Sequence, residues 1–506
     1  MRRIQLYRWW LPTLLFLIPA LPIAAQSFRV QCPTYTPAHP NPTTLPPGTP
    51  LAPGAIKCQQ ISGGDGFATM GDGTQTYLFG FGPLSGVQDI QNGLPGTEIV
   101  ATFNAVGGAN GAVGLVNPAT GAVDVAPIMN LGVMNANMPA PTMAIEEDDE
   151  FFLTLTNVGM IMRPDLFEQH TVHFHGYPNA SSFYDGVPDA SVAINIGGSF
   201  TYYYLAPDAG TYFWHCHVTP PEHLQMGMVG QLYVRPRQNR VSGSLYDGLV
   251  AQQADRRTAC YPHSTTTPFY DQTNPDILCS SPLPSNHGAV TGGGTYAYND
   301  GDASTAYDVE YPIQIHGFDP NFHFVGMTFN PEGFVDMKDK YFLLNGRSYP
   351  DTIKPGPQLT QSADGASHFS QPLPTIISIP TGGKALLRIS DLDVTEFQTL
   401  ASLGIPMHVV GINARLLRDL AGNDLTYYTN SITVGGGESV DVILDACAAR
   451  ATGGSCTTPI PSGTYYLYTP NLDHLSNDAE NFGGLMTEVH ICTSVDPLTK
   501  VGVGCK

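Results

Sequence analysis

The stretch GTYFWHCHVTPPEHLQMGM, residues 210–228, decides which kind of fold this chain has. Its first residues, GTYFW, are rich in aromatic and β-branched side chains, a composition that favours a β-strand. Because side chains alternate between the two faces of a strand, His215 and His217 share one face and Cys216 points to the other. The stretch therefore predicts a strand with imidazoles on one side and a thiol on the other.

A second histidine-rich stretch, HTVHFHG at residues 170–176, precedes the first by about forty residues. The same alternation places His173 and His175 on one face and Phe174 on the other. Six of the fifteen histidines lie in the two stretches, so isolated core or surface histidines are a poor explanation. One pair of strands can offer four imidazoles to one site while Cys216 serves a second site behind it.

The second site has the ligand set of a redox metal. Cys216 supplies a thiolate, and His170 and His223 are the imidazole candidates. Met228 is the expected axial thioether, with Met226 as the alternative. One thiolate, two imidazoles and a weak thioether suit copper that cycles between two oxidation states. Zinc is the competing metal, but a structural zinc site would use four strong ligands.

Short runs rich in Val, Ile, Tyr, Phe and Thr recur between glycines and prolines, as at 150–156, 199–205 and 439–444. They predict an all-β chain with little helix. The run from Pro141 into FFLTL resembles the run from Pro374 into ALLRI, and GTYF at 210 resembles GTYY at 463. We therefore expect two β-sandwiches in tandem. The expected divisions are a signal peptide (1–25), an irregular Pro-rich arm (26–60), a copper-binding domain (61–236), a connection (237–305), a second domain with a degenerate copper site (306–492) and a C-terminal tail (493–506).

The beginning of the chain predicts export. A basic start and the apolar run 11–23 precede Ala24 and Ala25, as in a cleaved secretory signal, although a retained anchor is the alternative. Export leads to the periplasm or the extracellular space, and no later segment predicts membrane insertion. The net charge of −21 argues against nucleic-acid partners. Apart from Cys216, the cysteines fall in close pairs that local disulfides would join: Cys32/Cys58, Cys260/Cys279, Cys447/Cys456 and Cys492/Cys505.

The two histidine stretches resemble the multicopper oxidase family, cupredoxin-fold proteins that include laccases and ascorbate oxidase. The resemblance implies tandem cupredoxin-like Greek-key β-sandwiches, in which His170, Cys216, His223 and Met228 hold type 1 copper. It implies that four further histidines form half of a type 2/type 3 copper ligand set: His173, His175, His215 and His217. Asp185, in the segment YDGVP, resembles a family carboxylate that helps to deliver protons, although a turn-forming Asp-Gly explains it equally well.

The second repeat departs from the family pattern. Tyr468, Thr469 and Pro470 stand where the first repeat has His215, Cys216 and His217. His408 alone matches a ligand position, and we expect that His316, His323 and His474 could approach the domain interface. A complete trinuclear cluster would thus need another chain, and a homotrimer, as in small two-domain relatives and copper nitrite reductases, would supply it. The Cys216–His223 spacing also resembles nitrite reductases, but His173 and His217 argue against that activity.

These observations predict a copper-dependent oxidoreductase. It would take single electrons from a small reducing substrate or a redox protein at type 1 copper and pass them through His215, Cys216 and His217 to further copper, with dioxygen as the acceptor. Catalytic roles are assigned to these three residues and to Asp185. The alternative is a mononuclear blue-copper electron-transfer or copper-binding protein without oxidase activity. A purely structural protein would leave the paired histidines without a purpose.

Overall fold

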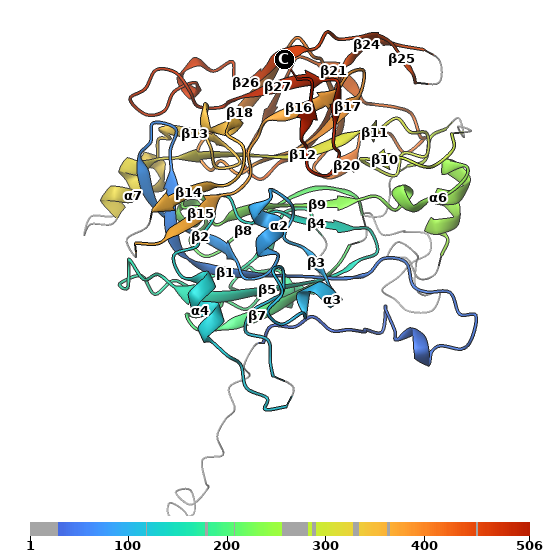
Figure 1. Cartoon of the computed structure of the whole chain (residues 1–506). Coiled ribbons are helices and arrows are strands. Elements are labelled where there is room, and N and C mark those ends of the chain that lie inside the picture. Colours follow the sequence, from blue (N-terminus) through green and yellow to red (C-terminus); the bar gives the residue numbers. More distant parts are fainter. Residues whose placement is uncertain are drawn as a thin grey trace, which may run out of the picture.

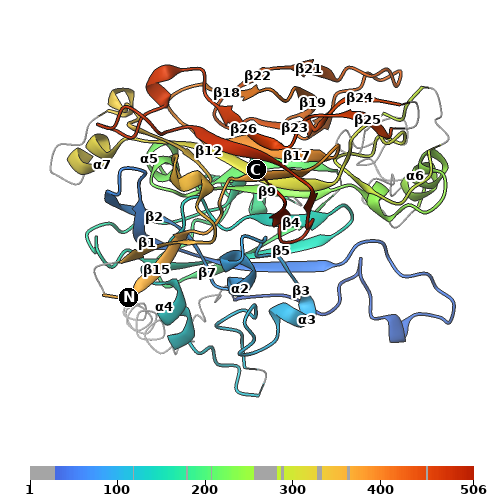
Figure 2. The same ribbon diagram turned by 45° about the horizontal axis from the view of Figure 1, so that its top comes forward.

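The chain folds into two β-sandwiches that stack on each other, so that four sheets lie in successive layers (Figures 1 and 2). The computed structural model describes residues 29–117, 119–177, 181–206, 208–255, 282–285, 290–326, 333–361, 365–451 and 454–505. The predicted signal peptide and the predicted Cys260/Cys279 pair lie outside these residues. The division of the chain into domains stays a prediction, although the strand order described next is compatible with it.

The first sandwich has one sheet with the strand order β2-β1-β5-β7, extended by β3 on β1, and a second sheet with the order β4-β9-β8-β6. Its strands are β1 (Ile56–Thr69), β2 (Gln75–Pro83), β3 (Glu98–Ile99), β4 (Met143–Glu146), β5 (Glu150–Gly159), β6 (His173–Phe174), β7 (Ser199–Leu205), β8 (Gly210–His215) and β9 (Val229–Arg235). β1 begins inside the stretch that was expected to be an irregular arm.

The second sandwich has one sheet with the order β13-β12-β17-β23-β19-β20, with β21 on β19, and another with the order β16-β27-β26-β18-β22. Its strands are β12 (Val309–Phe318), β13 (Tyr341–Leu344), β16 (Ile377–Pro380), β17 (Lys384–Asp391), β18 (Gln398–Leu403), β19 (Met407–Ile412), β20 (Arg415–Leu416), β21 (Tyr427–Thr429), β22 (Ser431–Val434), β23 (Ser439–Asp445), β26 (Gly463–Tyr468) and β27 (Met486–Cys492). Four two-stranded sheets complete the strands of the described residues: β10 (Thr295–Tyr296) with β11 (Ala306–Tyr307), β14 (Gln358–Gln361) with β15 (Ser367–Gln371), β24 (Cys447–Arg450) with β25 (Cys456–Pro459), and β28 (Ser494–Val495) with β29 (Gly502–Val503).

The two sandwiches repeat one strand arrangement. β1 pairs in parallel with β5, which pairs antiparallel with β7, and β12, β17 and β23 repeat both pairings. β4 pairs in parallel with β9, which pairs antiparallel with β8, and β16, β27 and β26 repeat these as well. The predicted tandem all-β fold, with strands at the three quoted runs, is confirmed.

Each sandwich has its own apolar core. The core of the first contains Trp214, which is fully buried and lies 5.1 Å from Phe81 between ring centroids. Cys216 and Met228 belong to the same cluster of buried side chains. The core of the second sandwich is built mainly from aliphatic residues of β12, β17 and β23. The sulfur groups of the candidate site are therefore part of the core of the first sandwich alone.

The strand that carries the candidate site lies against the second sandwich. β8 packs on β17 and β23, and Figure 1 shows β8 and β9 between the remaining sheets. The hydroxyl of Thr211 on β8 donates a 2.6 Å hydrogen bond to Asp441 on β23. Gln231 on β9 donates from its amide to the backbone oxygen of Arg388, at 2.9 Å. Buried hydrogen bonds therefore fix the position of the site relative to the second sandwich.

Helices are short throughout the described residues. They are η1 (Pro42–Thr44), α2 (Val87–Gln91), α3 (Val100–Phe103), α4 (Ala126–Gly132), η2 (Ser182–Tyr184), α5 (Pro220–Gln225), η3 (Arg237–Arg240), α6 (Leu245–Gln253), α7 (Pro320–Gly326), η5 (Phe334–Asp336), η6 (Asp351–Ile353) and η7 (Leu472–His474). Within the described ranges, no helix combines the length and the apolarity needed to cross a bilayer.

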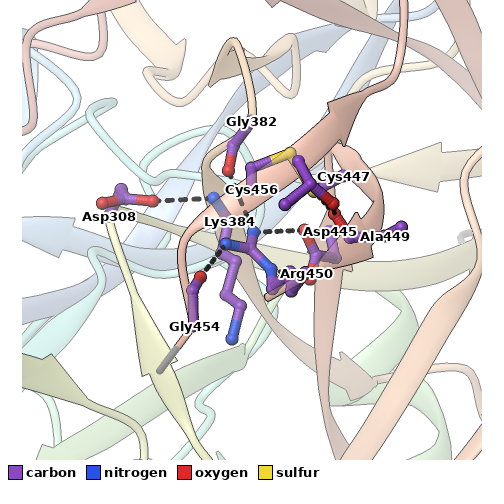
Figure 3. Close-up of a disulfide and its surroundings, with 10 residues drawn as sticks. Asp308, Gly382, Lys384, Asp445, Cys447, Ala449, Arg450, Gly454 and Cys456 are labelled. Carbon is purple, nitrogen blue, oxygen red and sulfur yellow. Dashed lines mark hydrogen bonds and ion pairs between the residues drawn. A yellow bond between two sulfur atoms is a disulfide. The ribbon is translucent and has the colours of Figure 1, made fainter. Parts of the chain in front are cut away.

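Three of the four predicted disulfides are present, and they join Cys32 to Cys58, Cys447 to Cys456 and Cys492 to Cys505. Figure 3 shows the second of these, which closes the β24–β25 hairpin. The guanidinium of Arg450 on this hairpin donates to the Asp445 carboxylate and to the backbone oxygens of Gly382 and Gly454. The disulfide and the arginine together hold the hairpin against the end of β23. Cys216 remains a free, buried thiol.

Candidate metal centre

The first candidate site lies inside the first sandwich. Cys216 follows the end of β8, His170 precedes β6, and His223 belongs to α5. Each of the three offers a ligand atom, and these atoms lie within 4.8 Å of one another. All three side chains are buried, and Nδ1 of His223 lies 3.4 Å from Sγ of Cys216. Two imidazoles and a thiol, far apart in sequence, thus converge in a site closed to solvent.

The loop after Cys216 places Met228 at the same site. The N–H of Cys216 donates to the backbone oxygen of Met228 at 3.0 Å, and the N–H of Met228 donates to that of His223 at 2.9 Å. Met226 is also buried in this cluster, but these backbone bonds join Met228 directly to two of the three clustered residues. Met228 as the axial ligand, with Met226 as the alternative, stays a prediction.

The Cys216 thiol is poised to ionise. Burial opposes ionisation, but the adjacent His223 and His170 rings outweigh it and lower the pKa of Cys216 well below its ordinary value. The N–H of Thr171 lies 3.4 Å from Sγ and donates to it. A thiolate held by such a donor is the form of cysteine that binds metals.

His170 provides the test of whether a metal fits here. Its ring is fully buried, and among the described residues its two nitrogens have no close hydrogen-bond partner apart from a contact with the Cys216 thiol. Buried imidazole nitrogens are normally paired, so this ring lacks a partner that a metal ion would supply. Burial also lowers the pKa of His170, which favours the neutral ring that coordinates metals. The donor set and the orphaned ring both fit copper.

Glu168 borders the first site and was not singled out in the sequence. Its Oε2 lies 3.5 Å from Nε2 of His223, and its side chain is partly exposed whereas that of His223 is buried. The opposite ring nitrogen of His223 faces Cys216. His223 therefore links the buried thiol to a carboxylate at the surface. An isolated Glu in a loop carries no signal that could have predicted this contact.

The second candidate site is formed by the other four histidines. β6 pairs with β8 so that His173 lies opposite His215. Ring centroids are 5.4 Å apart for His173 and His215, 5.0 Å for His175 and His215, and 4.9 Å for His173 and His217. The ligand atoms of His173, His175 and His215 lie within 4.8 Å of one another. His217 adjoins this group without completing it. The expected two faces are present, since Cys216 points away from these rings toward the first site.

Backbone atoms orient three of these rings. Nδ1 of His173 donates to the backbone oxygen of Asp185 at 2.7 Å, and Nδ1 of His215 donates to that of Cys216 at 2.7 Å. The backbone of Gly437, in the second sandwich, hydrogen-bonds the ring of His175. Such bonds fix the orientation of a metal-binding imidazole and leave the other nitrogen free. The free Nε2 atoms of His175 and His215 lie 3.0 Å apart.

His175 and His215 are held in the neutral form. Burial lowers the pKa of His215 to about 3. Burial, followed by the charge of His173, lowers the pKa of His175 to about 4. Neutral imidazoles are the form that coordinates a metal, and these two rings are neutral at ordinary pH.

Asp185 lies beside this group, as the sequence predicted. Its backbone oxygen accepts the bond from His173, and its Oδ1 lies 3.6 Å from the same ring nitrogen. At this distance the carboxylate lies near the ring without a direct hydrogen bond to it, so an exchange of protons would need a bridging water. The role assigned to it from the resemblance stays a prediction.

The second sandwich covers one side of the histidine group. A cavity of about 370 Å³ lies between them, lined by His175, Phe213 and His215 on one side and by residues 393–397 and 435–437 on the other. Gly437 approaches so closely that a Cβ added to it would lie 2.8 Å from Nδ1 of His175. Sequence reasoning missed Gly437, because a backbone contact from a distant turn leaves no pattern in the ligand stretches.

The histidines of the second repeat have other partners. Nε2 of His316 donates to the backbone oxygen of Leu224 at 3.0 Å, and Nε2 of His323 donates to the side chain of Gln225 at 2.8 Å. His474 hydrogen-bonds Gln398 and lies 3.0 Å from the Glu396 carboxylate. His408 bonds Thr426. His316 and His323 do reach the interface, where they fix α5, but none of the four belongs to a group of potential metal ligands among the described residues.

Known proteins resemble part of this chain. The family model described as multicopper oxidase matches residues 120–239, which include both histidine stretches. Laccase abr2 of Aspergillus fumigatus is 30% identical over 174 residues, which cover 31% of this chain and 28% of that protein. L-ascorbate oxidase of Cucumis sativus is 32% identical over 120 residues, which cover 22% of this chain and 18% of that protein.

Each match thus spans less than a third of the relative's own length. Solved structures cover more of the chain at lower identity. A blue copper oxidase from Nitrosomonas europaea has a TM-score of 0.47 at 17% identity, covering 86% of this chain and 85% of that one. A copper nitrite reductase from the same organism has a TM-score of 0.45 at 12% identity, covering 88% of this chain and 98% of that one.

Proposed function

We propose that this chain is a copper-dependent oxidoreductase of the multicopper oxidase type, which takes single electrons at one copper site and uses them at a second; the match of residues 120–239 to the multicopper oxidase family model supports the proposal. One observation carries the proposal. Two groups of potential metal ligands lie back to back and are joined by the single peptide bond between His215 and Cys216. The family implies copper, and the two distinct sites are our assignment.

We assign His170, Cys216, His223 and Met228 as ligands of a type 1 copper. The donor set, the orphaned His170 ring and the low pKa of the Cys216 thiol support this assignment. We assign His173, His175, His215 and His217 to further copper of type 2 or type 3. When bound, copper at these positions would supply one-electron redox chemistry.

The residues of the chain provide the connection between the sites. Sγ of Cys216 belongs to the first group, and the rings of His215 and His217 on either side belong to the second. A covalent path of one residue in each direction therefore links the thiolate to the imidazoles. The N–H of Thr171 stabilises negative charge on Sγ. Asp185 lies near His173 and would exchange protons with the second group through a bridging water.

Electron donors would enter at the Glu168 edge of His223. This ring reaches from the buried thiol toward a partly exposed carboxylate, so it connects the first site to the surface. Glu168 would favour donors that carry a positive charge or an acidic hydroxyl, which its carboxylate can bind. Phenols, low-valent metal ions and basic redox proteins belong to these classes.

We propose dioxygen as the electron acceptor, with the cavity of about 370 Å³ beside His175 and His215 as the place where it reaches the second group. The second sandwich already covers His175, so a further chain would have to approach from the side of His173 and His217. The proposed homotrimer would therefore bring a neighbouring chain to that side of the histidine group. Export to the periplasm or the extracellular space is likewise proposed, in agreement with the three disulfides.

A second candidate function is electron transfer at a single blue copper without oxidase activity. Two observations favour it. Only three of the four imidazoles of the second group offer ligand atoms that lie close to one another. His316, His323 and His474, which could have added ligands, hydrogen-bond other groups instead.

An oxygen electrode separates the two functions. The copper-loaded chain is first reduced by a phenol or by ferrous ion without oxygen, and oxygen is then admitted. An oxidase consumes oxygen over many turnovers, and Cys216→Ser removes this consumption. An electron carrier is reduced by the donor but consumes no oxygen catalytically, an outcome that would contradict the proposed oxidase.

A further inference from the structure

A second cavity, of about 330 Å³, lies on a different part of the interface between the two sandwiches. β4 and β9 of the first sandwich form one wall, and β12 of the second forms another. The segments 93–97, 372–373 and 497–500 close it. Its volume falls in the range of small-molecule pockets, roughly 300–1,000 Å³. None of the proposed copper ligands lines it.

Gln314 points a buried amide at this cavity. Alternate residues of β12, namely Glu310, Pro312 and Gln314, line the wall, as expected for one face of a strand. The backbone N–H and C=O of Gln314 are both paired with Asn345. Its side chain is only 1% exposed, and neither the amide nitrogen nor the amide oxygen has a hydrogen-bond partner among the described residues.

An unpaired buried amide is an unusual feature. Leaving a buried donor and acceptor without partners destabilises the folded state, and for that reason native proteins rarely do so. On the facing strand β9, the amide of Gln231 is bonded to Arg388 and Ser390. Among the described residues, the amide oxygen of Gln231 is unpaired, but Gln314 lacks a partner at both amide atoms, and it lines a space large enough to hold one.

The charged residues of the cavity indicate the kind of ligand. Lys57, Arg235 and Lys500 line it together with Asp89 and Glu310. The Glu310 carboxylate is already bound by Arg235 at 2.8 Å, and also by Arg388 of the adjacent strand β17 at 3.0 Å. Among the lining residues, Asp89 is then the only carboxylate left opposite the two lysines, and the charge of Lys57 also acts on Glu98 and Asp149 outside the lining. This balance favours an anionic group on the ligand.

The other lining groups restrict the ligand further. The Gln314 amide oxygen and the Asp89 carboxylate accept hydrogen bonds, so the ligand needs a donor such as a hydroxyl or an ammonium group. Leu94, Leu373 and Leu498 offer apolar surface for a short carbon skeleton. From these features we propose that the cavity binds a small carboxylate that also carries a hydroxyl or amino group. The carboxylate lies toward Lys57 and Lys500, and the Gln314 amide binds the adjacent polar atoms. The proposal is independent of the copper chemistry.

Isothermal titration calorimetry on the full mature chain tests this site. The probes are L-malate and L-leucine. N-methylacetamide is the neutral comparison: its amide can hydrogen-bond the Gln314 amide, but it carries no carboxylate. We expect one site per chain for at least one of the two acids and no heat from N-methylacetamide. Gln314→Leu and Lys500→Gln should each weaken binding at least tenfold, and Lys354→Gln, at an exposed lysine outside the cavity, should leave it unchanged.

The controls keep the proposal open to contradiction. Gln314→Leu removes the unpaired amide, so its thermal midpoint without ligand should not fall below that of the wild type. If Gln314→Leu does not fold, the affinities of Lys57→Gln and Lys500→Gln for the two acids provide the test instead. Absence of binding by both acids, or equal affinity in the cavity variants, overturns the site. Equal binding of N-methylacetamide overturns the assignment of a carboxylate ligand.

Discussion

Nδ1 of His223 lies 3.4 Å from Sγ of Cys216, while Nε2 of the same ring lies 3.5 Å from the Glu168 carboxylate. One imidazole therefore spans the distance from the buried thiol to the surface. Among the described residues, the two nitrogens of the neighbouring His170 ring have no close hydrogen-bond partner apart from a contact with the Cys216 thiol. These two histidines are where the proposed metal chemistry can be tested most sharply.

Cys216→Ser should abolish blue colour and leave the fold intact. The hydroxyl is a much weaker ligand than the thiolate, and the change from sulfur to oxygen removes little volume from the large cluster of buried side chains to which Cys216 belongs. Visible absorption after copper loading measures the colour, and circular dichroism measures the fold. Survival of the blue band in this variant would show that Cys216 is not the thiolate ligand.

Met228→Leu should raise the reduction potential of the blue site and change its spectrum, because loss of a thioether donor destabilises the oxidised metal. Met226→Leu is the matched control, since Met226 is a buried methionine of the same loop. It should leave potential and spectrum unchanged. Redox titration followed at the blue band measures both. A change in the control alone would reverse the assignment of the axial ligand.

Gly437→Ala should disturb the second histidine group without affecting the first. The new Cβ would lie 2.8 Å from Nδ1 of His175 and force this ring to move. Gly454→Ala is the control, because Gly454 has nearly the same positive φ, 87° against 89°, and nothing within 4 Å of its Cβ. Both substitutions cost about 1–2 kcal/mol of backbone strain.

Copper analysis of the two glycine variants provides the measurement. We expect Gly437→Ala to lose copper relative to the wild type while it keeps the blue band, and Gly454→Ala to lose none. Equal copper content in both variants would show that His175 does not hold metal or that the turn can move away.

The N-terminal arm should detach as pH rises. Nδ1 of His39 lies 2.6 Å from the Glu150 carboxylate at the start of β5. This hydrogen bond raises the pKa of His39 above 6.5, whereas bonds from His39, Thr36 and Tyr203 outweigh burial and lower the pKa of Glu150. The pair is therefore fully present below pH 6.5 and is lost as pH passes through the raised pKa of His39.

Hydrogen exchange of residues 29–55, corrected for its intrinsic pH dependence, measures this detachment. Exchange should increase several-fold between about pH 6 and about pH 9 in the wild type, and His39→Gln should remove the pH dependence. Unchanged exchange across this range would mean that the Cys32–Cys58 disulfide alone fixes the arm.

The strands and the two sites were largely predictable from local pattern. The alternation of side chains along a strand correctly placed Cys216 on the opposite face from His215 and His217. It could be used because this alternation depends only on the local backbone. The pairing of the cysteines within each sandwich followed from proximity in the chain. The weak second repeat was recognisable from Tyr468, Thr469 and Pro470, which stand where the first repeat has potential ligands.

Contacts between distant segments were not predictable. Gly437 reaches His175 from a turn of the second sandwich, and His316 bonds the backbone beside His223. Neither contact depends on a recognisable motif, because one uses backbone atoms and the other an isolated histidine. The unpaired amide of Gln314 is likewise visible only once its neighbours in space are known.

Copper content per chain, measured together with visible and EPR spectra of the copper-loaded protein, tests the central claim most directly. Our account predicts a blue type 1 signal that depends on Cys216 and, in addition, further copper that gives a type 2 signal or near-ultraviolet type 3 absorption. A single copper with only the blue signal would contradict the proposed second site and identify the chain as an electron carrier.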